Sequence, residues 1–416
     1  MQLDTIIRVL EHLPVQMVVM CTEVCKGWKA AAEHAVLQQP VIVDHLDGQL
    51  PLLQRLKVTK LKLLANSFAT QSFATYASRL GSLKALDLWF SDNHPIVQAL
   101  LLRESARANE HDGIALRSET VLRSLHTIGA LQDLSLGNVL LTVNGCQLVS
   151  GALGCMPGLC KLKLMLVYFS ETGDDAVWDA LPAGLQSLTL VNLYGQQHLR
   201  KVPPSLQTLS LHRVGMRQET AIALLRGLPR TLRHVDIHGW CSNAIYSFLK
   251  PMVYDRVAFP AHGCLSMLRL EAVNLGPEDF RTLMLRLPPT VTRLELACNT
   301  LGAGAFATAF GALPTSVSWL DLSYNNFIPA DLEHAIIPHC LGVHTLVLSG
   351  NHYMFGVFMP YPDVVRMLCS AVRARGDALR SIQCNNCGWD QRHARNGARM
   401  YQDLMDMAEG RAWNWH

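Results

Sequence analysis

Val291-Thr-Arg-Leu294-Glu-Leu296-Ala-Cys-Asn299 is the first of three closely similar stretches that decide the fold of this chain. The pattern returns as Val317-Ser-Trp-Leu320-Asp-Leu322-Ser-Tyr-Asn325 and as Val343-His-Thr-Leu346-Val-Leu348-Ser-Gly-Asn351, and each copy starts 26 residues after the previous one. A fixed period of this size predicts a solenoid, in which each unit buries its apolar side by stacking on its neighbours. The alternative is three ordinary amphipathic strands that match by coincidence.

Alternation within each copy sorts the side chains between the two faces of a short strand. Leu294 and Leu296 point to one face and form the core, whereas Arg293 and Glu295 point to the other. The asparagine that closes each copy, for example Asn325, stands where the chain turns out of the strand. Backbone groups at such a turn would otherwise be buried without partners, so we expect this side chain to be buried and to hydrogen-bond to them.

The same pattern recurs with varying fidelity over most of the chain and resembles the leucine-rich repeat. The predicted strands are 58–63, 83–88, 131–136, 159–164, 185–190, 206–211, 232–237, 265–270, 291–296, 317–322, 343–348 and 379–384. The segments between them show helical periodicity and end in Leu-Pro, as 303–313 and 278–287 do. This arrangement predicts an α/β solenoid shaped like a horseshoe, with a parallel sheet on the concave face and helices outside.

The first 43 residues follow a different pattern. Apolar residues recur at helical spacing from Leu3 to Leu13, Pro14 ends that helix, and Val24-Cys25-Lys-Gly-Trp28 follows a second apolar segment. This order resembles the F-box family, a small helical module with a Leu-Pro step and a Val-Cys-x-x-Trp signature. The chain departs from that family in lacking the Leu-Pro step that usually precedes the first helix. The alternative is a helical cap that covers the first repeat.

The F-box resemblance implies a function in a ubiquitin ligase of the Skp1-cullin-F-box class. Residues 1–43 would dock on a Skp1-type adaptor, and through it on a cullin. The implied contact residues are Leu3, Ile6, Ile7, Leu10, Leu13, Pro14, Met17, Val24, Cys25 and Trp28. The repeats at 44–389 would hold an unidentified target protein, and residues 390–416 would form a helical C-terminal cap. The alternative function is a protein-binding scaffold resembling ribonuclease inhibitor, whose N-terminal helices are only a cap.

A group of outward-facing side chains is the candidate target site. On three successive predicted strands one outward column consists of Met267, Arg293 and Trp319, and the next consists of Arg269, Glu295 and Asp321. Alternation turns Trp319 away from the core, and Trp and Arg are the residue types most enriched in interface hot spots. The alternative is that Arg293 stacks on Trp319 within the free protein as a cation–π pair.

Composition excludes several other classes. The chain of 416 residues carries a formal net charge of +3 with scattered lysines and arginines, so we expect no nucleic-acid partner. No apolar run is long enough to span a membrane, and Asp4, Arg8 and Glu11 interrupt the apolar core that a secretory signal needs. Twelve cysteines are too sparse for a disulfide scaffold in a chain this long. Buried reduced thiols, such as those of Cys298 and Cys384, and a cytoplasmic or nuclear location are the simpler interpretation.

Two clusters could carry chemistry, but both fit the repeat architecture better. Cys384 and Cys387 lack the second pair of ligands that a zinc site needs, and they fall in repeat register. A metal or proton-transfer site could also be built from the outward-facing residues His212, His234, Asp236 and His238. Outward faces of such solenoids are polar by construction, so a solvated polar face is the better explanation, and we expect no catalytic residue, no metal and no cofactor.

Insertions interrupt the period of the repeat. Residues 89–125 contain the polar and charged stretch 103–119, which we expect to form an excursion loop. Residues 353–378 begin with an aromatic cluster, which could be a binding hot spot or could pack on the edge of the solenoid. The members of that cluster are Tyr353, Phe355, Phe358 and Tyr361.

Overall fold

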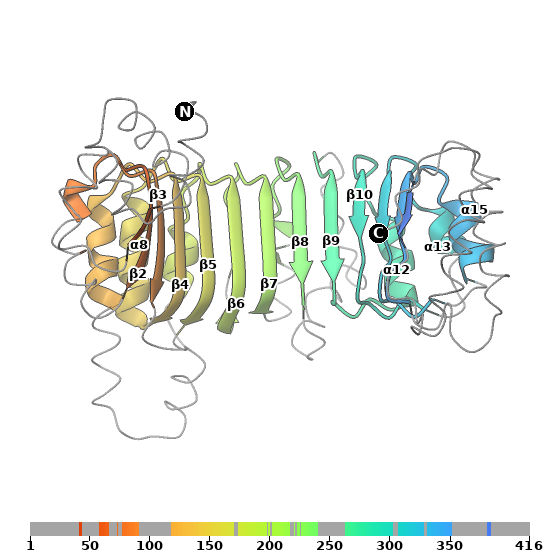
Figure 1. Ribbon diagram of the computed structural model, residues 1–416, viewed down its shortest axis with the longest axis horizontal. Coiled ribbons are helices and arrows are strands. Elements are labelled where there is room, and N and C mark those ends of the chain that lie inside the picture. Colours follow the sequence, from red (N-terminus) through yellow and green to blue (C-terminus); the bar gives the residue numbers. More distant parts are fainter. Residues whose placement is uncertain are drawn as a thin grey trace, which may run out of the picture. The chain divides into compact units, whose positions relative to one another are not determined.

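The structure is a computed structural model that divides into two compact units, Met1–Leu206 and Gln207–His416. It describes residues 41–43, 58–65, 73, 77–90, 118–169, 174–197, 199, 202–216, 220, 223–224, 226–239, 263–302, 307–327, 331–351 and 381–383. Within each unit the strands are parallel and follow one another in chain order (Figure 1). Consecutive repeats are therefore spatial neighbours, which is the arrangement of a leucine-rich-repeat solenoid.

The first unit contains the strands β1 to β6. They are β1 (Val41–Val43), β2 (Lys60–Ala65), β3 (Ala85–Phe90), β4 (Asp133–Leu141), β5 (Lys161–Phe169) and β6 (Ser187–Gln197). Each strand pairs in parallel with the next. One column of this register consists of inward-facing leucines that are at most 2% exposed: Leu61, Leu86, Leu134, Leu162 and Leu188.

The second unit contains the strands β7 to β13. They are β7 (Thr208–Met216), β8 (His234–His238), β9 (Met267–Glu271), β10 (Arg293–Glu295), β11 (Trp319–Asp321), β12 (Thr345–Val347) and β13 (Ser381–Gln383). An equivalent buried column consists of Leu209, Val235, Leu268, Leu294, Leu320 and Leu346. Full burial of one such side chain contributes about 1.5–3 kcal/mol, so these columns form the core of each unit. All twelve strands predicted from the sequence are present, as β2 to β13.

Helical segments link many of the strands (Figure 1). They are η1 (Ala77–Arg79), η2 (Leu125–Thr127), α8 (Val143–Gly154), α9 (Asp174–Asp179), α12 (Pro277–Met284), α13 (Ala307–Gly311), η3 (Leu332–Ile336) and α15 (Ile337–His339). Helices of neighbouring repeats contact one another, as α8 and α9 do. Between α12 and α13 the rings of Phe280 and Phe310 pack with their centroids 4.9 Å apart. The helices thus stack in the same order as the strands.

Local sequence signals place the starts of two helices. Pro277 stands in the first turn of α12, where its missing N–H is not needed, and the carboxylate of Asp279 accepts the N–H of Gly276 at 3.1 Å. At the start of α8, the hydroxyl of Thr142 accepts the N–H of Gly145 at 3.0 Å. These caps satisfy backbone donors that have no partner within the helix.

A residue in the left-handed backbone conformation follows the strand core in eight repeats. It stands two positions after the second leucine of the motif, or after its equivalent. These residues are Asn138, Leu166, Asn192, Arg213, Ala272, Cys298, Tyr324 and Gly350, with φ between 51° and 68°. An L-residue in this region costs roughly 1–2 kcal/mol, so its return in repeat after repeat shows that the turn is required by the fold.

The three predicted asparagines form a buried ladder between repeats. Asn325 is fully buried, and its amide nitrogen donates to the backbone oxygens of Leu296 and Ser323 at 2.8 and 2.9 Å. Its side-chain oxygen accepts the backbone N–H of Asn299 at 3.1 Å. The N–H of Asn325 in turn donates to the side chain of Asn351 at 2.9 Å. The predicted role of the asparagine, to satisfy backbone groups at the strand exit, is confirmed.

Two expectations need correction. The loop predicted at 103–119 cannot reach its predicted end, because residues 118–124 are helical and Leu122 is fully buried. Glu119 lies on this helix, and its carboxylate accepts the hydroxyl of Thr142 at 2.6 Å. The thiols are also less uniformly buried than expected. Cys298 is half-exposed because it occupies the left-handed turn instead of a core position, and Cys155 and Cys264 are exposed.

Several predictions fall outside the described residues. These are the F-box-like stretch before residue 41, the insertion at 91–117, the aromatic cluster at 353–361, the pair Cys384 and Cys387, and the cap at 390–416. The proposed limits at residues 43 and 389 therefore stay predictions. In the part of the chain that the structure describes, no helix is long and apolar enough to cross a membrane.

Candidate functional site

The register of β9, β10 and β11 assembles the predicted target site. Arg293 pairs with Met267 on one side and with Trp319 on the other. Two positions further along, Glu295 lies between Arg269 and Asp321. Paired strands are about 4.8 Å apart, so these side chains form one continuous surface. We call it the β9–β11 patch: Met267, Arg269, Arg293, Glu295, Trp319 and Asp321.

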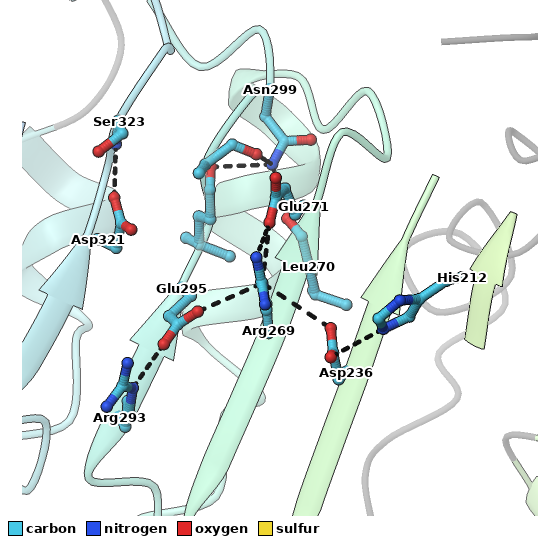
Figure 2. Close-up of polar contacts among 12 residues, drawn as sticks. His212, Asp236, Arg269, Leu270, Glu271, Arg293, Glu295, Asn299, Asp321 and Ser323 are labelled. Atoms are coloured by element: carbon cyan, nitrogen blue, oxygen red, sulfur yellow. Dashed lines mark hydrogen bonds and ion pairs between the residues drawn. The ribbon is translucent and has the colours of Figure 1, made fainter. Parts of the chain in front are cut away.

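Arg269 is the centre of an ion-pair network on this face (Figure 2). Its Nε lies 2.8 Å from Oε2 of Glu271 and 3.3 Å from Oε2 of Glu295. The same atom is 3.9 Å from Oδ1 of Asp236 on the neighbouring strand. The other oxygen of Asp236 lies 2.9 Å from Nε2 of His212. One guanidinium thus connects carboxylates from three adjacent strands.

Glu295 is buried although it faces away from the leucine core. It is 7% exposed, and its two oxygens contact Arg269 and Arg293. A carboxylate removed from water without a partner would be strongly destabilising, whereas two guanidinium groups compensate for the lost hydration. The sequence predicts the direction of this side chain correctly but not its burial, because burial depends on the two arginines folding over it.

Burial and the charges of this network together shift two pKa values. Burial alone would lower the pKa of Arg269, but the hydrogen bond to Glu271 and the charges of Glu271, Asp236 and Glu295 together raise it. Burial lowers the pKa of His238, and the charges of His212 and Arg269 act in the same direction, while Glu271 opposes them. The arginine is therefore permanently charged, and the neutral form of His238 is favoured.

Trp319 lies at the edge of the network and is half-buried. The guanidinium carbon of Arg293 stands 4.5 Å from the centroid of its ring, so the cation–π contact predicted as the alternative to a target site is present. The indole Nε1 is shielded from solvent and has no hydrogen-bond partner among the described residues. Arg293 therefore joins the buried Glu295 to an aromatic ring that remains partly open to solvent.

The two remaining members of the patch stand outside the network. Asp321 turns toward the exit of its own strand, where Oδ1 accepts the N–H of Ser323 at 2.9 Å. Met267 is half-buried and pairs in register with His234 as well as with Arg293. The six predicted residues thus lie together, but they have three different local roles. Their part in binding a target stays a prediction.

The histidine cluster is brought together only in part. The rings of His212 and His238 lie 5.7 Å apart, and His212 contacts Asp236, whereas His234 is exposed in a different register column. Among the described residues, no group of three or more His, Cys, Asp or Glu side chains could hold a metal ion. The cluster therefore contributes to the charged face and shows no metal-binding geometry.

Glu271, Asp236 and His212 are network members that the sequence-based patch does not include. The signal for Glu271 is present in the sequence, because it follows Arg269 by two positions and so faces the same side of β9. Asp236 and Arg269 are opposite one another in the β8–β9 register. Extending the predicted columns by one row would have found Glu271, and extending them by one strand would have found Asp236. His212 lies one strand further away, on β7. The ten residues predicted to contact a Skp1-type adaptor lie outside the described residues.

Comparisons with known proteins give a distant likeness to solved structures. No family model matches the chain, and no curated protein matches it. A chain in a structure titled "Crystal structure of TLR13-ssRNA13 complex" matches with 18% sequence identity and a TM-score of 0.46. The match covers 79% of this chain and 43% of that one, so this chain spans less than half of its length.

Proposed function

We propose that this chain is a non-catalytic, protein-binding leucine-rich-repeat protein that holds its target at the β9–β11 patch. The observation that supports this function best is the position of Trp319. Its indole lies on the outward side of a parallel sheet, beside charged side chains that ion pairs hold in place. Solenoids of this kind present such faces as extended binding surfaces.

The network makes the patch a preorganised surface. Arg269 and Arg293 are fixed by Glu271 and Glu295, so a target that docks here orders few of the protein's side chains. Preorganisation of this kind lowers the entropic cost of association. The internal contact between Arg293 and Trp319 contributes about 0.5–1 kcal/mol at an exposed site. Trp319 can contribute more than this when a target covers it, because interface hot spots reach ~2 kcal/mol and above.

The experiment compares proteins captured by the wild-type chain with those captured by two variants. Trp319→Ala should lose a specific set of captured proteins while its melting temperature stays close to that of the wild type. Leu285→Ala is the matched control, because Leu285 is an apolar residue with 66% exposure near α12, away from the patch. If Trp319→Ala retains the same captured proteins in the same amounts, the anchor lies elsewhere. The aromatic cluster at 353–361 would then be the next site to test.

The finer proposal is that the chain is the substrate-recognition subunit of a Skp1-cullin-F-box ubiquitin ligase. Its support is the sequence order in residues 1–43, with the Leu13-Pro14 step followed by Val24, Cys25 and Trp28. In this function the chain would raise the effective concentration of target lysines near a ubiquitin-conjugating enzyme. The competing proposal keeps the binding face but makes the N-terminal helices a simple cap.

Co-purification with a purified Skp1-type adaptor separates the two. Leu13→Asp should abolish co-purification, because an apolar interface contact worth ~1.5–3 kcal/mol is replaced by a buried charge. Leu285→Asp makes the same chemical change at an exposed position and should leave co-purification intact. If the wild-type chain does not bind the adaptor at all, the scaffold function is favoured. The Trp319 experiment is unaffected by that result, because it reads target binding alone.

A further inference from the structure

The outward face of the first unit carries a regular arrangement of charge. In the register of β2 to β5, two rows cross the strands, and each begins and ends with a lysine. One row is Lys60, Ala85, Asp133 and Lys161, and the next is Lys62, Asp87, Ser135 and Lys163. Lysine pairs on β2 and β5 therefore flank two aspartates on β3 and β4, which leaves an excess of positive charge at both ends.

The aspartates do not neutralise this face. Lys62 and Asp87 are 3.8 Å apart and both more than a third exposed, so water screens their attraction. Burial raises the pKa of Asp133, while the charge of Lys161 acts in the opposite direction. Lys60, Lys161 and Lys163 are exposed. The lysine pairs are accessible to a partner that carries negative charge.

An apolar row runs beside the two charged rows. It consists of Trp89, Gly137, Met165 and Val191, which are paired across β3, β4, β5 and β6. A Cβ atom at Gly137 would lie 2.2 Å from Cε3 of Trp89, so the indole rests directly on the glycine backbone. Trp89, Met165 and Val191 are half-buried. The absence of a side chain at Gly137 is what allows the indole to occupy this place.

We propose that this face binds an extended, acidic segment of a partner protein. The lysine pairs on β2 and β5 are three strand spacings apart, about 14 Å, which matches four residues of extended chain at ~3.3 Å each. Acidic side chains at positions i and i+4 would meet the two lysine pairs, because they point to the same side of an extended segment. Apolar side chains at i+1 and i+3 would point to the opposite side, toward Trp89 and Met165. Position i+2 faces the aspartates, which favours a hydroxyl group there.

A nucleic acid fits this arrangement less well. A nucleic-acid backbone carries a phosphate on every nucleotide, so phosphates would meet Asp87 and Asp133 as well as the lysines. A peptide can place a neutral residue at that point. This inference is independent of the proposed target site, because it concerns the other unit and different side chains.

The test measures binding of the full chain to the labelled peptide Glu-Leu-Ser-Leu-Glu. Its matched isomer, Leu-Glu-Ser-Glu-Leu, has the same composition and charge but places the acids two residues apart. We expect the first peptide to bind about tenfold more tightly, which corresponds to ~1.4 kcal/mol, and expect this preference to weaken as salt is added. A single-stranded thymidine hexanucleotide serves as the nucleic-acid competitor and should not displace the peptide.

Variants connect the result to this face. The double charge reversal Lys161→Glu and Lys163→Glu should weaken binding of the peptide about tenfold or more, because it removes one of the two cationic ends. Arg123→Glu reverses one charge at an exposed residue of the helical segment 118–124 and should bind like the wild type. The proposal is overturned if the wild-type chain binds neither peptide, if the two isomers bind equally, or if the hexanucleotide displaces the peptide.

Discussion

The repeats at β4 to β6 and those at β10 to β12 leave their strands by the same turn but continue differently. β4, β5 and β6 are nine, nine and eleven residues long, whereas β10, β11 and β12 have three residues each. Both groups place a left-handed residue two positions after the second leucine. The residue after that turn differs: it is Val139, Val167 or Leu193 in the first group and Asn299, Asn325 or Asn351 in the second.

The difference lies in how backbone groups find partners beyond the turn. In the first group the ladder skips one residue and resumes, as Val139 pairs with Val167 and Leu141 pairs with Phe169. In the second group the strand ends and an asparagine amide takes over, as the side chain of Asn299 does for the N–H groups of Val273 and Leu275. Buried backbone groups must be paired in either case. After the same turn, the backbone groups are thus paired either by a resumed strand or by an asparagine side chain. The type of the residue after the turn indicates which of the two is used.

The largest expected effect comes from removing an asparagine of the ladder. Asn325→Ala leaves three backbone groups unpaired and should cost about 3 kcal/mol, at roughly 1 kcal/mol for each hydrogen bond. Urea unfolding gives the free energy, and hydrogen exchange should show lost protection at the N–H of Asn299. Gln186→Ala removes an exposed amide and should leave both measurements unchanged.

The equivalent change in the other group sharpens the contrast. Val167→Ala should cost about 1.5 kcal/mol for the lost apolar burial, yet the strand hydrogen bonds around it should keep their protection from exchange. If Val167→Ala instead exposes the backbone N–H groups of β5 as Asn325→Ala does for its neighbours, then the two repeat types do not differ in the way described.

An effect between these two in size is expected at the glycine of the shared turn. Gly350 has φ of 68°, and a Cβ there would lie 2.2 Å from Cε1 of Tyr324. Gly350→Ala should therefore cost about 2 kcal/mol, from backbone strain and from displacement of the ring. Tyr324 is 44% exposed, so the ring has room to move. In the double variant Tyr324→Ala and Gly350→Ala, the part of the lost stability that comes from the contact with the ring should be recovered. The part that comes from backbone strain should remain lost.

The opposite change should stabilise a repeat. Ala272 has φ of 53° at the same turn, and its methyl group is nearly buried. Ala272→Gly removes strain of roughly 1–2 kcal/mol, but it adds backbone entropy worth ~0.5–1 kcal/mol to the unfolded chain and loses a buried methyl group worth about 0.8 kcal/mol, so a gain of at most about 0.5 kcal/mol is expected. The melting temperature measures it. A lower value would mean that the left-handed turn is not strained at this position.

The smallest effect is a pH dependence confined to the second unit. Burial lowers the pKa of His238 below its ordinary value of 6.5, so the unfolded chain takes up this proton more readily than the folded chain does. Stability is therefore complete above about pH 6.5 and falls as the pH drops through the lowered pKa. His238→Gln should flatten this part of the pH–stability curve. His234→Gln, at an exposed position of the same strand, should keep the wild-type slope.

The first unit provides the contrast for that measurement. The outward columns of β2 to β6 that the structure describes contain lysine, aspartate, serine and threonine but no histidine. Hydrogen exchange followed between pH 5 and 7 should therefore show the histidine-linked change in β8 and its neighbours, and not in β4 and β5. Equal changes in both units would show that the effect has another origin.

Much of the fold could be predicted because the repeat encodes it several times. The spacing of Leu294, Leu320 and Leu346 predicts which strands are neighbours, and alternation within each copy predicts which side chains face outward. Both predictions agree with the register. The left-handed turn could not be predicted, because residues as different as Leu166, Arg213 and Tyr324 occupy it. The geometry of the whole repeat imposes this strained conformation, so the type of residue at the turn does not predict it.

The sequence by itself determined the order of the strands, the inward leucine columns, the asparagine ladder and the membership of the β9–β11 patch, since each follows from spacing along the chain. Only the tertiary structure decided that Glu295 is buried, that Arg269 gathers Asp236, Glu271 and Glu295, and that Arg293 lies against Trp319. Long charged side chains have several carboxylates within reach. The carboxylate that a given arginine contacts depends on the distance between the two groups and on the hydration that each of them loses. Neither quantity can be calculated from the spacing of residues along the chain.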